Sequence, residues 1–73
     1  MAYMKNQLIA KGYPISKWRE LIDEWIFSED HRKLVKTWLL DGATIDEAAE
    51  KHCFSGRNAS KIIASAYLKL IEL

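Results

Sequence analysis

The stretch TIDEAAEKHCFSGRNASKIIASAY, residues 44–67, decides the fold that we predict for this chain. Thr44 is followed three residues later by Glu47, which is the spacing of a capping box, so a helix begins here. The small alanines after Glu47 allow a second helix to cross closely. Ser55 is a second capping residue. The sequence therefore predicts two helices joined by a turn of a few residues.

The second predicted helix has an apolar side and a polar side. Its apolar residues recur at helical spacing, and they are Ala59, Ile62, Ile63, Ala66 and Leu70. Arg57, Asn58 and Lys61 fall outside this stripe, in the first two turns of the helix. In a helix-turn-helix, this part of the second helix enters the major groove of DNA. The pattern is typical of a helix-turn-helix over about residues 44–67.

Six residues are candidate contacts to DNA, and they are Thr44, Ser55, Arg57, Asn58, Ser60 and Lys61. Arginine suits guanine and asparagine suits adenine through paired hydrogen bonds, whereas lysine is equally suited to a phosphate. Thr44 stands at a helix N-terminus, where the free N–H groups favour a phosphate. The alternative for the basic residues is a solvated helix face. We favour that alternative for three residues of the preceding helix, Arg32, Lys33 and Lys36.

Short motifs around the helix pair match a known pattern. The run from Leu40 to Thr44 ends a helix with an acidic residue and a glycine before a capping residue, and an acidic pair and an alanine follow. Phe54 and Ser55 then place a hydrophobic residue and a serine before the second helix. In these features residues 31–70 resemble the C-terminal, promoter-reading helix-turn-helix of bacterial sigma factors and of small sigma-like regulators from phages and mobile elements.

The resemblance implies a small transcriptional regulator that binds duplex DNA, with RNA polymerase as a further partner. The chain departs from the family at Ala48, where a larger aliphatic residue is usual, and at His52-Cys53, where a leucine-glycine pair is usual. It is too short to be a complete sigma factor. The rival interpretation is a protein-interaction module that keeps the helix-turn-helix as a scaffold, for example an RNA polymerase adaptor, a packaging-complex subunit or an inhibitor.

Composition predicts one small folded domain over residues 1–73. The hydrophobic share of 49% is that of a packed globule, although a core of this size supplies only about 3–5 kcal/mol. The net charge of +1 is low for a nucleic-acid-binding protein. The second helix and its tail are more basic, because Arg57, Lys61 and Lys69 face only Glu72 there. The chain has neither a long apolar run nor a secretion signal, so we expect a cytoplasmic protein without membrane contact.

The remaining patterns complete an all-α fold of about five short helices. A helix over residues 2–11 has Met1, Met4, Leu8 and Ile9 on one face, and Gly12 ends it. A helix over residues 16–27 begins at Ser16, and its apolar stripe is Trp18, Leu21, Ile22, Trp25 and Ile26. A third helix follows Ser28 and ends at Gly42, with a stripe of Leu34, Val35, Trp38 and Leu39.

No catalytic, cofactor or metal site is predicted. His52 and Cys53 are adjacent, but the other ligands of a zinc site are missing from the pattern. A nucleophilic Cys53 would need a base held by a third group. We therefore interpret Cys53 as a small buried hydrophobic residue and the protein as a non-enzyme.

The last two turns of the chain predict association. Leu68 and Ile71 project away from the core stripe and Tyr67 lies between the two sides, and a helix that is apolar nearly all round is normally covered. These three residues are the predicted dimer interface. The N-terminal helix is one possible cover. A second copy is the alternative that we favour, because a homodimer adds buried area and supplies a second reading helix.

Overall fold

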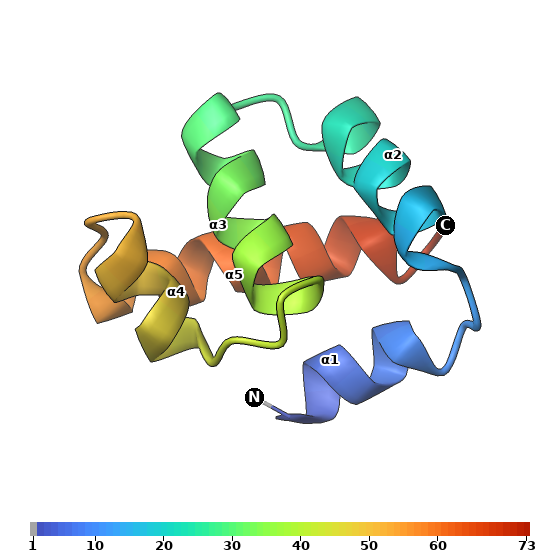
Figure 1. Ribbon diagram of the computed structural model, residues 1–73, viewed down its shortest axis with the longest axis horizontal. Helices are drawn as coiled ribbons and strands as arrows, with labels where there is room; N and C mark the ends of the chain where they lie inside the picture. Colours follow the sequence, from blue (N-terminus) through green and yellow to red (C-terminus); the bar gives the residue numbers. More distant parts are fainter. Residues whose placement is uncertain (1) are drawn as a thin grey trace.

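The computed structural model describes residues 2–73, and this part of the chain is all-α, as the sequence predicts. Its five helices are α1 (Ala2–Ile9), α2 (Ile15–Trp25), α3 (Glu29–Leu39), α4 (Ile45–Lys51) and α5 (Gly56–Leu70). The helix α5 contacts each of the other four. Figure 1 shows α5 running along the molecule, with its first turns beside α4 and its last turns beside α2. The fold is therefore organised around α5.

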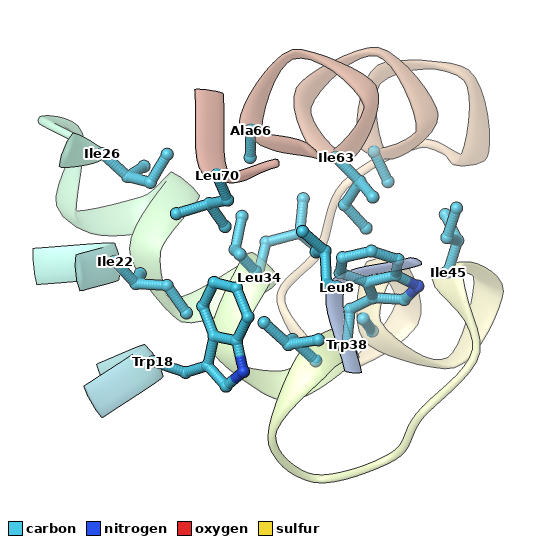
Figure 2. Packing of buried hydrophobic residues seen from close by; sticks show 14 of the residues in the cluster. Leu8, Trp18, Ile22, Ile26, Leu34, Trp38, Ile45, Ile63, Ala66 and Leu70 are labelled. Carbon is cyan, nitrogen blue, oxygen red and sulfur yellow. The ribbon is translucent and has the colours of Figure 1, made fainter. Parts of the chain in front are cut away.

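Buried side chains from all five helices point into one interior, which Figure 2 shows. Leu8 of α1, Trp38 of α3 and Ile63 of α5 are each at most 1% exposed. The predicted stripes are confirmed for α3, α4 and most of α5, whose buried members are Leu34, Val35, Trp38, Leu39, Ile45, Ala48, Ala49, Ala59, Ile63, Ala66 and Leu70. A single core thus includes both the proposed reading helix and the N-terminal helices.

The predicted glycine ends of α1 and α3 are confirmed, but the predicted start of α2 is wrong. Gly12 and Gly42 both have a φ of 77°, a left-handed conformation that glycine adopts without steric cost. The N-cap of α2 is Pro14 instead of Ser16, and the Pro14 carbonyl accepts the N–H of Trp18 at 3.1 Å. Proline suits a helix start, because its missing N–H would have no helical partner there.

Two residues expected on buried faces are exposed. Trp25 is 41% exposed because α2 ends at this residue, so no further turn covers its large ring. Ile9, the last residue of α1, is 57% exposed. Met4 is half-buried against the core, and Met1 lies outside the described residues. Within residues 2–73 no helix is both long enough and apolar enough to cross a membrane.

Candidate nucleic-acid interface

The first turn of α5 is fixed by Ser55. The Ser55 side-chain oxygen accepts the backbone N–H of Asn58 at 3.2 Å, and its carbonyl accepts the N–H of Ala59 at 2.9 Å. The side-chain bond satisfies one of the N–H groups that a helix start leaves without a partner, and the carbonyl bond is the first regular hydrogen bond of the helix. The predicted cap is confirmed, and it sets the direction in which α5 leaves the turn.

The turn before Ser55 is a Schellman motif with Cys53 in the left-handed position. The Phe54 N–H donates to the Ala49 carbonyl at 2.8 Å, and the Cys53 N–H donates to the Glu50 carbonyl at 3.4 Å. Cys53 has a φ of 61°, and its side chain is exposed. The prediction of a buried Cys53 is therefore wrong. The turn needs a left-handed residue at this point, and the side chain of that residue faces solvent.

The start of α4 is a complete capping box. The Glu47 N–H donates to the Thr44 hydroxyl oxygen at 3.1 Å, and the Thr44 N–H donates to a Glu47 carboxylate oxygen at 2.9 Å. The backbone and side-chain hydrogen bonds from Thr44 hold the pKa of Glu47 below its usual value. A carboxylate thus already occupies this helix N-terminus. A phosphate contact at Thr44 stays a prediction, and this carboxylate opposes it.

Lys5 ties α1 to the loop before α4. Its ammonium donates to the Ala43 carbonyl at 2.8 Å and lies 5.5 Å from the centre of the Trp38 ring. Partial burial lowers the pKa of Lys5, and the nearby Glu47 carboxylate acts in the opposite direction. The N-terminal helix therefore helps to hold the loop from which α4 begins.

His52 joins α4 to α3 by a side-chain contact. Its Nε2 lies 2.7 Å from the hydroxyl oxygen of Thr37, which is 6% exposed. The Phe54 ring in turn lies 6.2 Å from the His31 ring. Within the described residues, no group of three or more His, Cys, Asp or Glu side chains is placed to hold a metal ion. The role of His52 that the structure provides is to hydrogen-bond a buried threonine.

The polar residues at the start of α5 lie on its exposed side. Arg57, Asn58 and Lys61 are exposed, whereas Ala59 and Ile63 on the opposite side are 0% exposed. Arg57 and Lys61 are one helical turn apart, so their side chains are neighbours on the helix surface. Ser60 is only half-buried. Two cations and an amide are thus brought together on one accessible face, next to the turn.

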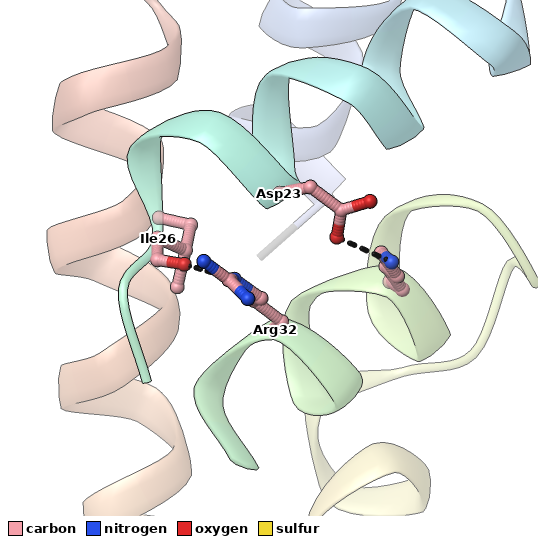
Figure 3. A network of polar contacts seen from close by, with 4 residues as sticks. Asp23, Ile26 and Arg32 are labelled. Carbon is pink, nitrogen blue, oxygen red and sulfur yellow. Dashed lines mark hydrogen bonds and ion pairs between the residues drawn. The ribbon is translucent and has the colours of Figure 1, made fainter. Parts of the chain in front are cut away.

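Two of the basic residues on α3 make contacts to α2 and to its C-terminal end, so they are not fully solvated. The Lys36 ammonium is paired with Asp23 of α2, at an N–O distance of 2.6 Å. A dashed line from Asp23 marks this pair in Figure 3. The Arg32 guanidinium donates from Nε to the carbonyl of Ile26 at the end of α2. The hydrogen bond from Lys36 is the main cause of the lowered pKa of Asp23. Only Lys33 of the three keeps an exposed side chain. Sequence reasoning missed these links, because they depend on how α2 and α3 cross.

The apolar end of α5 is covered only in part. The Lys11 ammonium donates to the carbonyl of Ile71 at 3.0 Å, and the Tyr13 hydroxyl donates to the carbonyl of Leu73 at 2.8 Å. The segment after α1 therefore reaches the end of α5. Tyr67 and Ile71 are half-buried, but Leu68 is 64% exposed. A homodimer through these residues stays a prediction, with Leu68 as its most accessible member.

Comparison with known proteins assigns no family to the chain. No protein-family model matches it, and neither the curated proteins nor the solved structures provide a significant match.

Proposed function

We propose that the chain is a small transcriptional regulator, of phage or mobile-element type, that binds duplex DNA in the cytoplasm. In this proposal α4 and α5 form a helix-turn-helix, and α5 enters the major groove. One observation carries it: Arg57, Asn58 and Lys61 lie together on the exposed face at the start of α5. The connection from α4 is tight, and Ser55 caps the helix, so this face is rigidly presented.

The three side chains of this face have the functional groups that bind DNA, so we favour a DNA-binding role for it over the role of a solvated helix face. A guanidinium matches the two acceptors of guanine, a carboxamide matches adenine, and an ammonium pairs with a phosphate. The 15 residues of α5 extend about 22 Å at the usual rise of an α-helix. The helix is therefore long enough for its first turns to lie in a groove while its last turns remain in the core.

A protein-interaction module is the second candidate, and exposed apolar residues favour it. Phe27 and Leu68 are 77% and 64% exposed, and the net charge is only +1. Exposed aromatic and aliphatic side chains are typical of a surface that binds another protein. RNA polymerase or a second copy of this chain would be the partner in that case. The homodimer is compatible with both candidates.

Binding to random duplex DNA with selection of the bound sequences tests the proposal. We expect a short consensus sequence, and affinity that falls linearly with salt on logarithmic axes, because neutralised phosphates release counterions. Arg57→Ala and Lys61→Ala should each weaken binding, and Arg57→Ala should also cost about 1–3 kcal/mol of preference at one base pair.

The matched control is Arg19→Ala, which removes an exposed cation from α2, away from the start of α5 (Figure 1). It should bind DNA as the unaltered protein does. Equal binding by all three variants, with unchanged circular dichroism, would refute α5 as the reading helix. The absence of any salt-dependent DNA binding would favour the interaction module.

A further inference from the structure

A pocket of about 380 Å³ opens beside the proposed DNA-binding face. It lies between α5 and the connection from α2 to α3, and its walls include Ile26, Phe27, His31, Lys61, Ile62 and Lys69. This volume falls within the range of small-molecule sites, about 300–1,000 Å³. The proposed DNA face accounts for only one of these residues, Lys61.

The walls of the pocket are apolar at the bottom and aromatic at the rim. Ile26 is 5% exposed and Ile62 is half-buried, and together they form a hydrophobic surface. The Phe27 ring at the rim is 77% exposed. A ligand with an apolar body would remove this area from water, which is favourable in proportion to the area covered. This composition favours a ligand with an apolar body, and the exposed Phe27 ring favours an aromatic one.

The two charged side chains that line the pocket are both cationic. Lys61 and Lys69 contribute two ammonium groups and His31 an imidazole, and the described lining residues include no Asp or Glu. The Lys69 ammonium lies 5.6 Å from the centre of the Phe27 ring. Among residues 2–73 the one ion pair is Lys36 with Asp23, so neither pocket lysine is in a direct ion pair with a carboxylate.

The two lysines stand at different ends of the pocket. They are eight residues apart on α5, which places their Cα atoms about 12 Å apart along the helix. Between the two lysines the pocket is lined by Ile62, Ser65 and Ala66, two of which are apolar. A ligand that satisfies both ends must therefore carry an acidic group at each end of an apolar body.

We propose that this pocket binds a small elongated aromatic dicarboxylate, with one carboxylate on Lys61 and the other on Lys69. If α5 reads DNA as proposed above, the bound ligand neutralises one of the cations of that face. Ligand and DNA then oppose each other, and each lowers the affinity for the other by the same factor. The pocket is in this way an effector site for the DNA-binding surface.

The binding test uses three probes that share one ring system: naphthalene-2,6-dicarboxylate, naphthalene-2-carboxylate and naphthalene-2,6-dicarboxamide. Titration calorimetry on the protein without DNA, at fixed ionic strength, measures each affinity. We expect the dicarboxylate to bind at least tenfold more tightly than the monocarboxylate, and the diamide more weakly than both. Equal affinity for the two acids would overturn the two-lysine site, and so would no binding of the dicarboxylate.

Variants locate the site. Lys61→Gln and Lys69→Gln should each reduce the dicarboxylate affinity at least tenfold, to the level of the monocarboxylate. Lys17→Gln removes an exposed lysine of α2 that does not line the pocket, and it should leave the affinity unchanged. All three lysines are at the surface, so circular dichroism should be the same in each variant. Equal losses in all three variants would show nonspecific attraction and overturn the proposal.

A DNA-binding experiment with the ligand present tests this inference separately from the proposed function. Saturating dicarboxylate should lower the affinity for the selected duplex at least tenfold, whereas the diamide should not. Lys69→Gln should still bind DNA, and it should need at least tenfold more dicarboxylate for the same effect. Binding of the dicarboxylate without any DNA binding would support the pocket and refute the proposed function. Unchanged DNA affinity with the pocket filled would overturn the effector role.

Discussion

Replacing Cys53 by glycine should stabilise the protein, although it removes a side chain. Cys53 occupies the left-handed position of the Schellman turn between α4 and α5, with a φ of 61°. A residue with a Cβ atom is strained in this conformation, whereas glycine is not. The Cys53 side chain is exposed, so its loss leaves no cavity in the core. The stability change therefore comes from the backbone alone.

The magnitude follows from two opposing terms. A left-handed residue other than glycine costs about 1–2 kcal/mol. Glycine makes the unfolded chain more flexible, which costs about 0.4–1 kcal/mol of stability. The net gain for Cys53→Gly therefore lies between about 0 and about 1.6 kcal/mol, with a middle value of about 0.8 kcal/mol. For a domain of this size the middle value corresponds to a rise in Tm of about 3–6 °C.

Thermal unfolding followed by circular dichroism, with a reducing agent present, measures this change. Cys53→Ala keeps the left-handed strain and serves as the matched control, with a Tm near that of the unaltered protein. Gly42→Ala is the reverse experiment, because Gly42 has a φ of 77° and an added Cβ would meet no atom within 4 Å. It should lose about 1 kcal/mol. A Tm of Cys53→Gly at or below that of Cys53→Ala would refute the reasoning.

Three further predictions concern the core, the helix start and the assembly. Trp38→Ala removes a ring that is 1% exposed and should lower the free energy of unfolding by about 3–5 kcal/mol. Circular dichroism at 25 °C should therefore show a largely unfolded chain. A melting point equal to that of the unaltered protein would contradict this prediction. The lowered pKa of Glu47 means that its contribution to stability is complete above the ordinary value of 4.5 and is lost as the pH falls below it. The free energy of unfolding of Glu47→Gln, measured by urea titration, should therefore fall less between neutral and acid pH than that of the unaltered protein. An identical fall in both proteins would exclude the Glu47 carboxylate as the source of the acid destabilisation. Leu68→Glu replaces a leucine that is 64% exposed by a charged residue, and light scattering should show that the predicted dimer becomes a monomer. If the unaltered protein is already monomeric at high concentration, the dimer is excluded.

Local patterns predicted the helix starts and ends well where a single residue decides them. The capping box at Thr44 and the cap at Ser55 are both confirmed by their hydrogen bonds. Such motifs involve residues only three apart, so their geometry depends little on the rest of the fold. The start of α2 was the exception, because Pro14 and Ser16 both suit a helix start and only the structure distinguishes them.

Burial was predicted less well, because periodicity identifies a face but not how far it is covered. Trp25 continues the stripe of α2, yet it lies at the last residue of that helix and stays 41% exposed. The residue type predicts a buried Cys53, whereas the backbone of the turn decides its exposure. Contacts between distant segments, such as Lys36 with Asp23, depend on helix crossing and have no local sequence signal.

The candidate site divides in the same way. The sequence placed Arg57, Asn58 and Lys61 on the polar side of a helix, and all three are exposed. The pocket next to them could not be predicted, because its two sides come from segments at least thirty residues apart in the chain. Phe27 illustrates the difficulty, since its residue type suggests burial and the structure leaves it 77% exposed at the rim.

The geometry of α5 makes the proposed roles separable by single substitutions. The buried stripe of α5, which includes Ile63, stabilises the fold. In the two proposals Arg57 is part of the DNA face only, and Lys69 is part of the pocket only. Lys61 is the one residue shared by the proposed DNA face and the pocket. Loss of DNA binding in Arg57→Ala with ligand binding intact, and the opposite result in Lys69→Gln, would establish two adjacent sites. Loss of both activities in Lys61→Gln would then identify this side chain as the link between them.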